Sequence, residues 1–312
     1  MKRPRPHNCA PSRRGLPAVR ALSILLITAL VAASASAGTV VDQLGRTVSV
    51  PRHPMRIVAL APSITEIVFA LGAQDRLVGV TRFSDYPNAA QALPKVGSYV
   101  QLDLEKIVSL EPDLCIAVKD GNPKAVVSRL EALGVPVYAV DPRNLEAVMD
   151  TIAEIGGLLD AQKSAAALAA GLRNRIERVT GKAASAGSKP GVFFQIGITP
   201  IVSVGTDTFI HELIEMAGGR NLAAGPTPYP RFSREQVLAL APEVFIITSM
   251  ARGETFDRVK AEWESWPSMP AASAGRIYLV DSNLFDRASP RLVDGLELLA
   301  RLIHPDIFGG SP

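Results

Sequence analysis

The feature that most restricts the fold of this chain is a helix–strand pattern that occurs twice, once on each side of a long helical stretch. The phrase LEKIVSLEPDL begins at Leu104, and the similar phrase REQVLALAPEV begins at Arg234. Each phrase places a glutamate near the start of a helical pattern, ends that pattern at a proline and leads into an apolar run. The repetition predicts two α/β lobes of similar construction.

Two other landmarks recur in the same order around this phrase. TEIVFALG corresponds to HELIEMAGG, so that Glu66 matches Glu212, and VYAVD at 137–141 corresponds to IYLVD at 277–281. Any single helix–strand unit can produce one such similarity by chance. Three in order indicate two copies of one supersecondary plan, which is too few for a solenoid array.

Apolar runs alternate with helical patterns in both halves. After a β-like start at 39–51, the first half has strand-like runs at 56–62, 76–80, 113–118 and 135–141, and helical patterns at 63–72, 104–110 and 126–134. The second half has strand-like runs at 192–198, 245–248 and 276–281, and helical patterns at 208–219, 234–240 and 291–303. Strands that alternate with helices predict mainly parallel sheets with helices on both faces.

The ends of the first helical pattern carry their own signals. Ser63 can cap this helix, with Glu66 three residues later as in a capping box, and Gly72 can end it.

Residues 145–183, between the two halves, are alanine-rich and helical in period, and they contain no strand signal. Gly156–Gly157 can end one helix before another begins, and residues 181–191 have the composition of a loop. We therefore predict an N-terminal lobe at 38–144, a linking helix at 145–183 and a C-terminal lobe at 184–312.

Residues 1–37 have the three parts of a secretory signal peptide. A basic region without acids precedes the apolar run ALSILLITALVAA, and an A-x-A cleavage site follows it. The apolar run is too short to span a bilayer. Arg13–Arg14 also suggest twin-arginine export, with Sec export as the alternative, and Cys9 precedes the apolar run, which excludes a lipidated cysteine. We expect an exported protein that begins at Gly38.

Removal of this leader changes the charge of the chain. The sequence has 33 basic and 30 acidic residues, and six of the bases but none of the acids lie in the leader. The remainder, with 27 bases against 30 acids, is slightly acidic. It lacks the positive charge that nucleic-acid binding requires, so we expect no nucleic-acid partner.

Residues typical of metal and catalytic sites are sparse. The exported part has one cysteine, Cys115, in an apolar run that is typical of a buried thiol. Its histidines, His53, His211 and His304, have no metal-ligand spacing. The sequence also lacks a nucleophile elbow, a phosphate loop and a dinucleotide fingerprint. We therefore predict no metal, no cofactor and no catalytic residue, and thus no enzyme.

The two copies of the repeated phrase place an acid at the start of a helix. Asp103 and Ser233 stand at the N-cap positions, and Glu105 and Glu235 follow at the second helical position. A carboxylate near a helix N-terminus is favoured by about 0.3–1 kcal/mol, so each can be an ordinary first-turn acid. As a pair on two similar lobes, they could instead be bound by arginines of a membrane partner with two-fold symmetry.

The sequence resembles the periplasmic substrate-binding proteins of ABC importers, in the class with a helical backbone between the lobes. It is most similar there to the cobalamin (vitamin B12) binders. The resemblance covers nearly the whole exported chain through APSITEIVFALG, VGVTRFSDYP, the LEKIVSLEPDL phrase, FFQIGITP, PYPRFSREQVLALAPE and FDRASPR. It implies a ligand cleft between two lobes and a monomer without a cofactor. It also implies docking on the permease dimer through Glu105 and Glu235.

The same resemblance implies the residues that bind a corrinoid. They are Tyr86, Tyr99, Phe194, Ile196, Tyr229, Asn283 and Arg287. Tyr99 and Tyr229 replace tryptophans of the family pattern, and Asn283 replaces an acid. Large rings with polar edges suit a flat amphipathic macrocycle. Structural roles remain open: the tyrosines could close turns or lie exposed in loops, and Arg287 could pair with Asp281 or Asp286.

Three other functions remain open from the sequence. The tyrosine substitutions also suit haem, because tyrosine can ligate haem iron, and arginines near the site would suit a ferric siderophore. An exported α/β enzyme is the alternative from another class. A ligand sensor that docks no permease is the third possibility.

Overall fold

The computed structural model describes Met1, residues 37–249 and residues 255–309. Apart from Met1 and Ala37, the predicted signal peptide lies outside the described residues. Residues from Gly38 onward form one compact unit.

Each half of the chain contributes one four-stranded parallel sheet. The first sheet holds β3 (Ile57–Ala59), β4 (Leu77–Val80), β5 (Leu114–Val118) and β6 (Val137–Val140), in the order β4-β3-β5-β6. The second holds β7 (Gly191–Gln195), β9 (Arg220–Asn221), β11 (Val244–Ser249) and β12 (Ile277–Asp281), in the order β12-β11-β7-β9. When each set is counted along the chain, both sheets have the order second-first-third-fourth. The predicted pair of similar α/β lobes is therefore confirmed at the level of topology.

Helices and short strands complete each lobe at matching places. The first lobe adds β1 (Ala37–Val41), β2 (Thr47–Pro51), α2 (Pro62–Ala70), η1 (Gln74–Arg76), η2 (Asn88–Ala92), α3 (Leu104–Ser109) and α4 (Lys124–Ala132). The second adds β8 (Ile201–Val202), α7 (Phe209–Met216), β10 (Arg231–Phe232), α8 (Arg234–Ala239), α9 (Thr255–Glu264), α10 (Pro270–Ser273), η3 (Ser282–Leu284), α11 (Leu292–Ile303) and α12 (Pro305–Phe308). Helices α2 and α7 follow the first strand of each sheet, and α3 and α8 precede the third.

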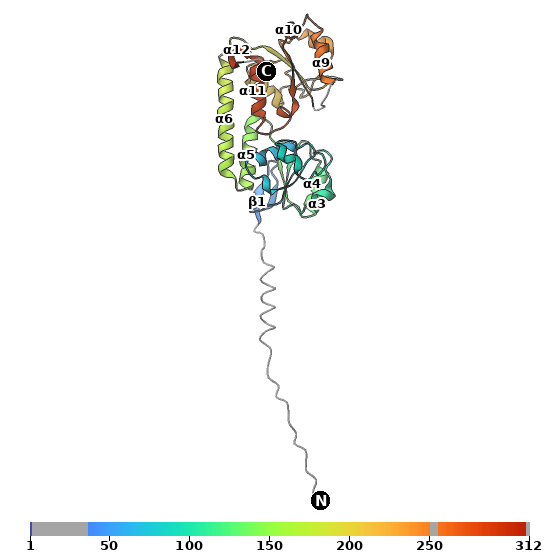
Figure 1. Ribbon diagram of the computed structural model, residues 1–312, viewed down its shortest axis with the longest axis vertical. Helices are drawn as coiled ribbons and strands as arrows, with labels where there is room; N and C mark the ends of the chain where they lie inside the picture. The colour runs from blue at the N-terminus through green and yellow to red at the C-terminus, as the bar shows by residue number, and fades with distance from the viewer. Residues whose placement is uncertain (2–36, 250–254, 310–312) are drawn as a thin grey trace. The chain divides into compact units, whose positions relative to one another are not determined.

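The linking segment consists of two helices, α5 (Leu145–Leu158) and α6 (Gln162–Ala184). Figure 1 shows α6 alongside α5 and beside α11 and α12, and these pairs are in contact. With 23 residues, α6 is about 34 Å long.

One expectation for this segment is confirmed and one needs correction. The predicted break at Gly156–Gly157 is present to within one residue, because α5 ends at Leu158 and α6 begins at Gln162. The glycine at 156 serves packing, because a Cβ there would overlap the Cβ of Ala165 in α6. Helix α6 continues to Ala184, so the first part of the predicted loop at 181–191 is helical. Burial of Val179 and Ala183 keeps this last turn packed.

The helix starts show which capping signals the fold uses. Asp103 and Ser233 are N-caps, as predicted. Asp103 Oδ1 accepts a hydrogen bond from the Lys106 N–H at 2.9 Å, and Ser233 forms a capping box with Gln236. The expected cap at Ser63 is wrong. Helix α2 starts at Pro62 with Ala61 as N-cap and has no side-chain capping bond.

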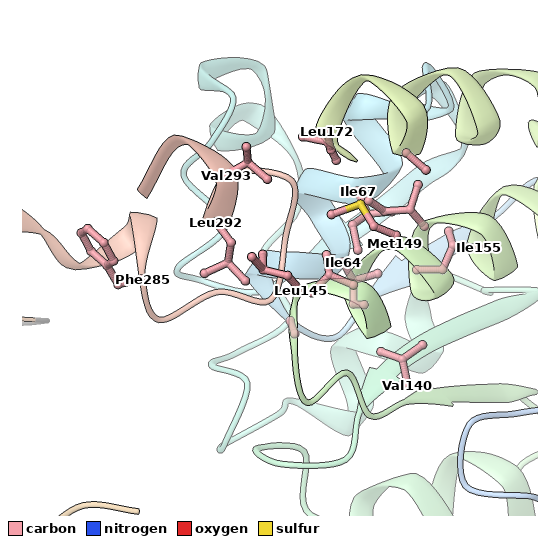
Figure 2. Packing of buried hydrophobic residues seen from close by; sticks show 14 of the residues in the cluster. Ile64, Ile67, Val140, Leu145, Met149, Ile155, Leu172, Phe285, Leu292 and Val293 are labelled. Carbon is pink, nitrogen blue, oxygen red and sulfur yellow. The ribbon is translucent and has the colours of Figure 1, made fainter. Parts of the chain in front are cut away.

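One apolar cluster joins the two lobes. It contains Ile64 of α2, Leu145 of α5, Ile210 of α7 and Leu292 of α11, all of them at most 5% exposed. Figure 2 shows Ile64, Leu145 and Leu292 among the residues of this cluster. Two smaller clusters cover the opposite faces of the sheets. The lobes therefore share a core, and a movement of one lobe against the other would disturb its packing.

Candidate functional site

The predicted ligand residues lie mainly on loops that leave the carboxyl ends of the parallel strands. In open α/β sheets this edge is where ligands bind. Residues 81–87 follow β4 in the first lobe, and residues 282–291 follow β12 in the second. Side chains of these two segments contact one another across the boundary between the lobes.

The loop after β4 is held by buried hydroxyl groups. The Thr65 hydroxyl donates to Ser84 Oγ at 2.9 Å, and Thr81 Oγ1 lies 3.0 Å from the same oxygen. This anchor leaves two rings in solvent, since Phe83 is 48% exposed and Tyr86 is 47% exposed. The hydroxyl-bearing residues of VGVTRFSDYP thus have a physical use here: small buried hydroxyls fix the backbone that displays the aromatic side chains.

The loop after β12 is anchored by an aromatic pair. Phe285 is 1% exposed, and its ring lies 5.3 Å from that of Phe194 in an edge-to-face arrangement. Phe194 itself has no exposed surface. The expectation that Phe194 forms a wall of the ligand site therefore needs correction, because its ring is buried in the core. Its role is to hold the loop that carries Arg287.

Arg287 extends from this loop into the first lobe. Its Nη1 donates to Glu66 Oε1 at 2.7 Å and to Asp85 Oδ1 at 2.9 Å, and its Nη2 donates to the Phe83 carbonyl at 2.9 Å. These partners differ from Asp281 and Asp286, the pairing partners considered from the sequence. Burial lowers the pKa of Arg287, but the hydrogen bonds and charges of the two carboxylates outweigh it, so the pKa is raised overall.

Three further residues at this boundary were not found from the sequence as parts of the site. Glu66 is 3% exposed and also accepts a hydrogen bond from the buried Ser289 hydroxyl at 2.5 Å. Arg291 lies with its Nη1 3.7 Å from Glu66, and its guanidinium stands over the Tyr86 ring, 4.1 Å from the ring centre. A signal for Glu66 was available, since it is the single acid in the otherwise apolar and hydroxyl-bearing segment 61–71.

The other predicted ligand residues lie separately. Tyr99 is half-buried against Gly121, and its carbonyl accepts a hydrogen bond from Asn122 at 2.8 Å. Tyr229 is 60% exposed between two prolines. Ile196 and Asn283 are half-buried, just after β7 and within η3. Within the described ranges, no side-chain hydrogen bond, ion pair or ring contact joins these four to another predicted ligand residue.

The two predicted docking acids occupy equivalent positions. Glu105 and Glu235 are exposed at the second residue of α3 and of α8. The hydrogen bond with Ser233 and the backbone N–H lower the pKa of Glu235, which favours the charged form. Both acids are thus displayed in the first turn of a short helix, as the repeated phrase predicts.

Clustered metal ligands and membrane-spanning helices are both absent from the part of the chain that the structure describes. No group of three or more potential metal-ligating histidine, cysteine or acidic side chains occurs there. None of its helices combines the length and apolar character needed to cross a lipid bilayer. Cys115 is a free, buried thiol whose pKa is raised to about 12 by burial first and by the charge of Asp113 second.

Comparison with known proteins identifies the family. Residues 57–284 match the model of a periplasmic binding protein. The chain belongs to the periplasmic binding protein family. An ABC transporter substrate-binding lipoprotein of Bacillus subtilis is 31% identical over 276 residues, which cover 86% of each chain. A vitamin B12-binding protein of Photorhabdus laumondii is 31% identical over 253 residues, covering 80% of this chain and 88% of the relative.

One solved structure is equally similar in sequence, but it is of a protein that binds heme. It is a periplasmic heme-binding protein from Pseudomonas aeruginosa, with a TM-score of 0.74 and 31% identity, covering 81% of this chain and 94% of the other. This periplasmic binding protein is therefore a substrate-binding protein of the ABC importer type, and it is not an enzyme. Members of the family bind a transported ligand and carry no cofactor.

Proposed function

We propose that this periplasmic binding protein captures cobalamin, or a related corrinoid, between its two lobes and delivers it to an ABC importer permease. The observation that carries the proposal is the display of tyrosine rings on both lobes: Tyr86 is 47% exposed and Tyr229 is 60% exposed. Exposed aromatic side chains on a rigid scaffold are typical of binding surfaces.

The physical fit concerns the shape and polarity of the ligand. A corrin ring is flat and largely apolar, with amide groups around its edge. Tyrosine rings can pack on its faces, and their hydroxyl groups can bond to its edge. Arg287 and Arg291 at the lobe boundary add donors for the polar periphery. The vitamin B12-binding relative at 31% identity supports the same ligand class.

Haem is the second candidate. Exposed tyrosines favour it, because a tyrosine oxygen can ligate haem iron. The heme-binding structure with 31% identity supports it to the same degree as the vitamin B12-binding relative supports cobalamin. A spectroscopic titration separates the two, because a tyrosine–iron bond changes the Soret band of haem.

The proposed ligand site is tested by replacing each exposed tyrosine with alanine. We expect Tyr86→Ala and Tyr229→Ala each to weaken cyanocobalamin binding about tenfold, the loss expected for one aromatic contact worth about 1–2 kcal/mol. Leu133→Ala is the matched control, because Leu133 is 58% exposed and belongs to no predicted site. Cyanocobalamin affinity that is unchanged in both tyrosine variants would contradict the proposed site. Loss of a haem Soret shift in either variant would instead support the second candidate.

Docking on the permease completes the proposed function. Glu105 and Glu235 would bind arginines of the permease dimer. Each glutamate would lie on one lobe, at 38–144 and at 184–312, and the segment 145–183 would link the lobes. The protein would dock as a monomer. Export would use the signal peptide at 1–37, with cleavage before Gly38. The double variant Glu105→Ala with Glu235→Ala should abolish uptake and leave ligand affinity unchanged.

The matched control for docking is Glu177→Ala, which removes an exposed acid from α6. This control should transport normally. Normal uptake by the double variant would refute docking through these two residues. N-terminal sequencing of the periplasmic protein would test the cleavage site.

A further inference from the structure

The strongest unexplained feature of the molecule is the buried carboxylate of Glu66. It lies in α2 of the first lobe, and its side chain is 2% exposed. A buried charge is costly unless ion pairs and hydrogen bonds compensate it. Among the residues that the structure describes, the compensating partners of this side chain are Arg287, Ser289 and Arg291, which come from the second lobe.

These partners divide the two carboxylate oxygens between them. Oε1 accepts from Arg287 Nη1 at 2.7 Å and lies 3.7 Å from Arg291 Nη1. Oε2 accepts from the Ser289 hydroxyl at 2.5 Å. Glu66 therefore fixes both ends of one short segment, 221 to 225 residues away in the sequence. That segment is the loop that carries the predicted ligand residue Arg287.

The contacts between the described residues of the two lobes do not engage the Nε–H group of Arg287, and this group could bind a ligand. A guanidinium has five N–H donors, and here three bonds engage Nη1 and Nη2. In the described part of the chain, its Nε–H has no hydrogen-bond partner. Fixed at Nη1 by Glu66, Arg287 can offer this group to a ligand without the entropic cost of ordering a long side chain.

We propose that Glu66 is a positioning residue for ligand binding: it holds Arg287 across the lobe boundary in the geometry that the ligand requires. Glu66 does not itself contact the ligand. The inference rests on the proposed function, since it assigns Glu66 a part in the same binding site.

The internal repeat supplies a matched control for this proposal. Glu212 of α7 corresponds to Glu66, and it too bonds outside its own lobe: Oε2 accepts from the backbone N–H of Leu145, at 2.9 Å. Its partner is the first residue of α5, not a ligand residue. Glutamine can still accept one hydrogen bond at either position, but only at Glu66 does the substitution remove a charge that faces arginines.

The experiment is a double-mutant cycle in ligand affinity, with cyanocobalamin and haemin as separate probes. Glu66→Gln should weaken binding of the transported probe about tenfold, and Arg287→Ala about tenfold to a hundredfold. The double variant should bind within about twofold of Arg287→Ala, because Glu66 acts through the arginine. Glu212→Gln should bind within about twofold of the wild type.

Four outcomes would count against the proposal, and they are distinguishable. Wild-type affinity in Glu66→Gln, or losses that multiply in the double variant, would overturn the positioning role while leaving the proposed function intact. An equal loss of affinity in Glu212→Gln would show that either of the two equivalent acids matters only for stability, which overturns the role as well. A wild-type protein that binds neither probe would overturn the proposed function and the positioning role together.

Discussion

The paired helix ends at Gly72 and Gly218 allow one substitution to be tested in two settings. Each glycine follows the last turn of an equivalent helix, α2 or α7, with a positive φ of 75° or 81°. Alanine in this left-handed conformation costs about 1–2 kcal/mol at either site. The surroundings differ, and this difference sets the prediction.

A Cβ added at Gly72 would meet nothing within 4 Å, whereas one at Gly218 would lie 2.7 Å from His304 Nε2 and 3.1 Å from the Cβ of Ala183. His304 is 7% exposed, and its Nε2 lies 3.1 Å from the Gly218 carbonyl, so its ring has little room to move. Overpacking of this kind costs about 1–3 kcal/mol more. We therefore expect losses of about 1–2 kcal/mol for Gly72→Ala and about 2–5 kcal/mol for Gly218→Ala.

Thermal unfolding followed by circular dichroism measures this difference. At about 2–4 °C per kcal/mol, Gly218→Ala should melt about 2–12 °C below Gly72→Ala. In a His304→Ala background the excess penalty at Gly218 should fall, because the closest clash is gone. Equal melting temperatures for the two glycine variants, or a larger loss for Gly72→Ala, would refute the packing described around Gly218.

Three further predictions concern charge and burial. Arg175 of α6 donates hydrogen bonds to Glu297 and Asp294 of α11. Arg175→Gln should therefore lower the free energy of unfolding in urea by about 1–2 kcal/mol, and by less at about 1 M salt. A loss of stability that does not change with salt would contradict this. Burial raises the pKa of Glu212, partly offset by a backbone N–H, so its stabilising contribution is present at low pH and is lost as the pH rises through the folded-state pKa. The stability of Glu212→Gln relative to wild type should therefore improve from pH 4 to pH 7, and a decline would contradict the raised pKa. The Cys115 thiol should react with a thiol reagent only after unfolding, and rapid modification of the native protein would contradict its burial.

Local signals allowed much of the fold to be predicted. The caps at Asp103 and Ser233 and the strand–helix alternation depend on residues close in sequence, and the structure confirms both. The start of the predicted loop at 181–191 was wrong, because the burial that keeps the last turn of α6 helical is not visible in the local pattern. Burial against a neighbouring element overrode local propensity there.

The candidate site was harder to predict because its contacts are long-range. Ser63 and Glu66 have the spacing of a capping box, yet Glu66 is bonded to Arg287 in the other lobe. Phe194 follows the family pattern for a ligand wall, but Phe285 covers its ring. Arg287 and the exposed tyrosines were predicted from the family resemblance. The partners of Arg287 could not be predicted, because they lie far from it in the sequence.

Calorimetric titration of the purified protein with cyanocobalamin, beside haemin and a ferric hydroxamate, tests the central claim most directly. We expect tight one-to-one binding of cyanocobalamin and no binding of the ferric hydroxamate. Absence of cyanocobalamin binding, with binding of the ferric hydroxamate or of no probe, would contradict the claim that this periplasmic binding protein carries a macrocycle. Binding of haemin alone would replace cobalamin with haem as the cargo.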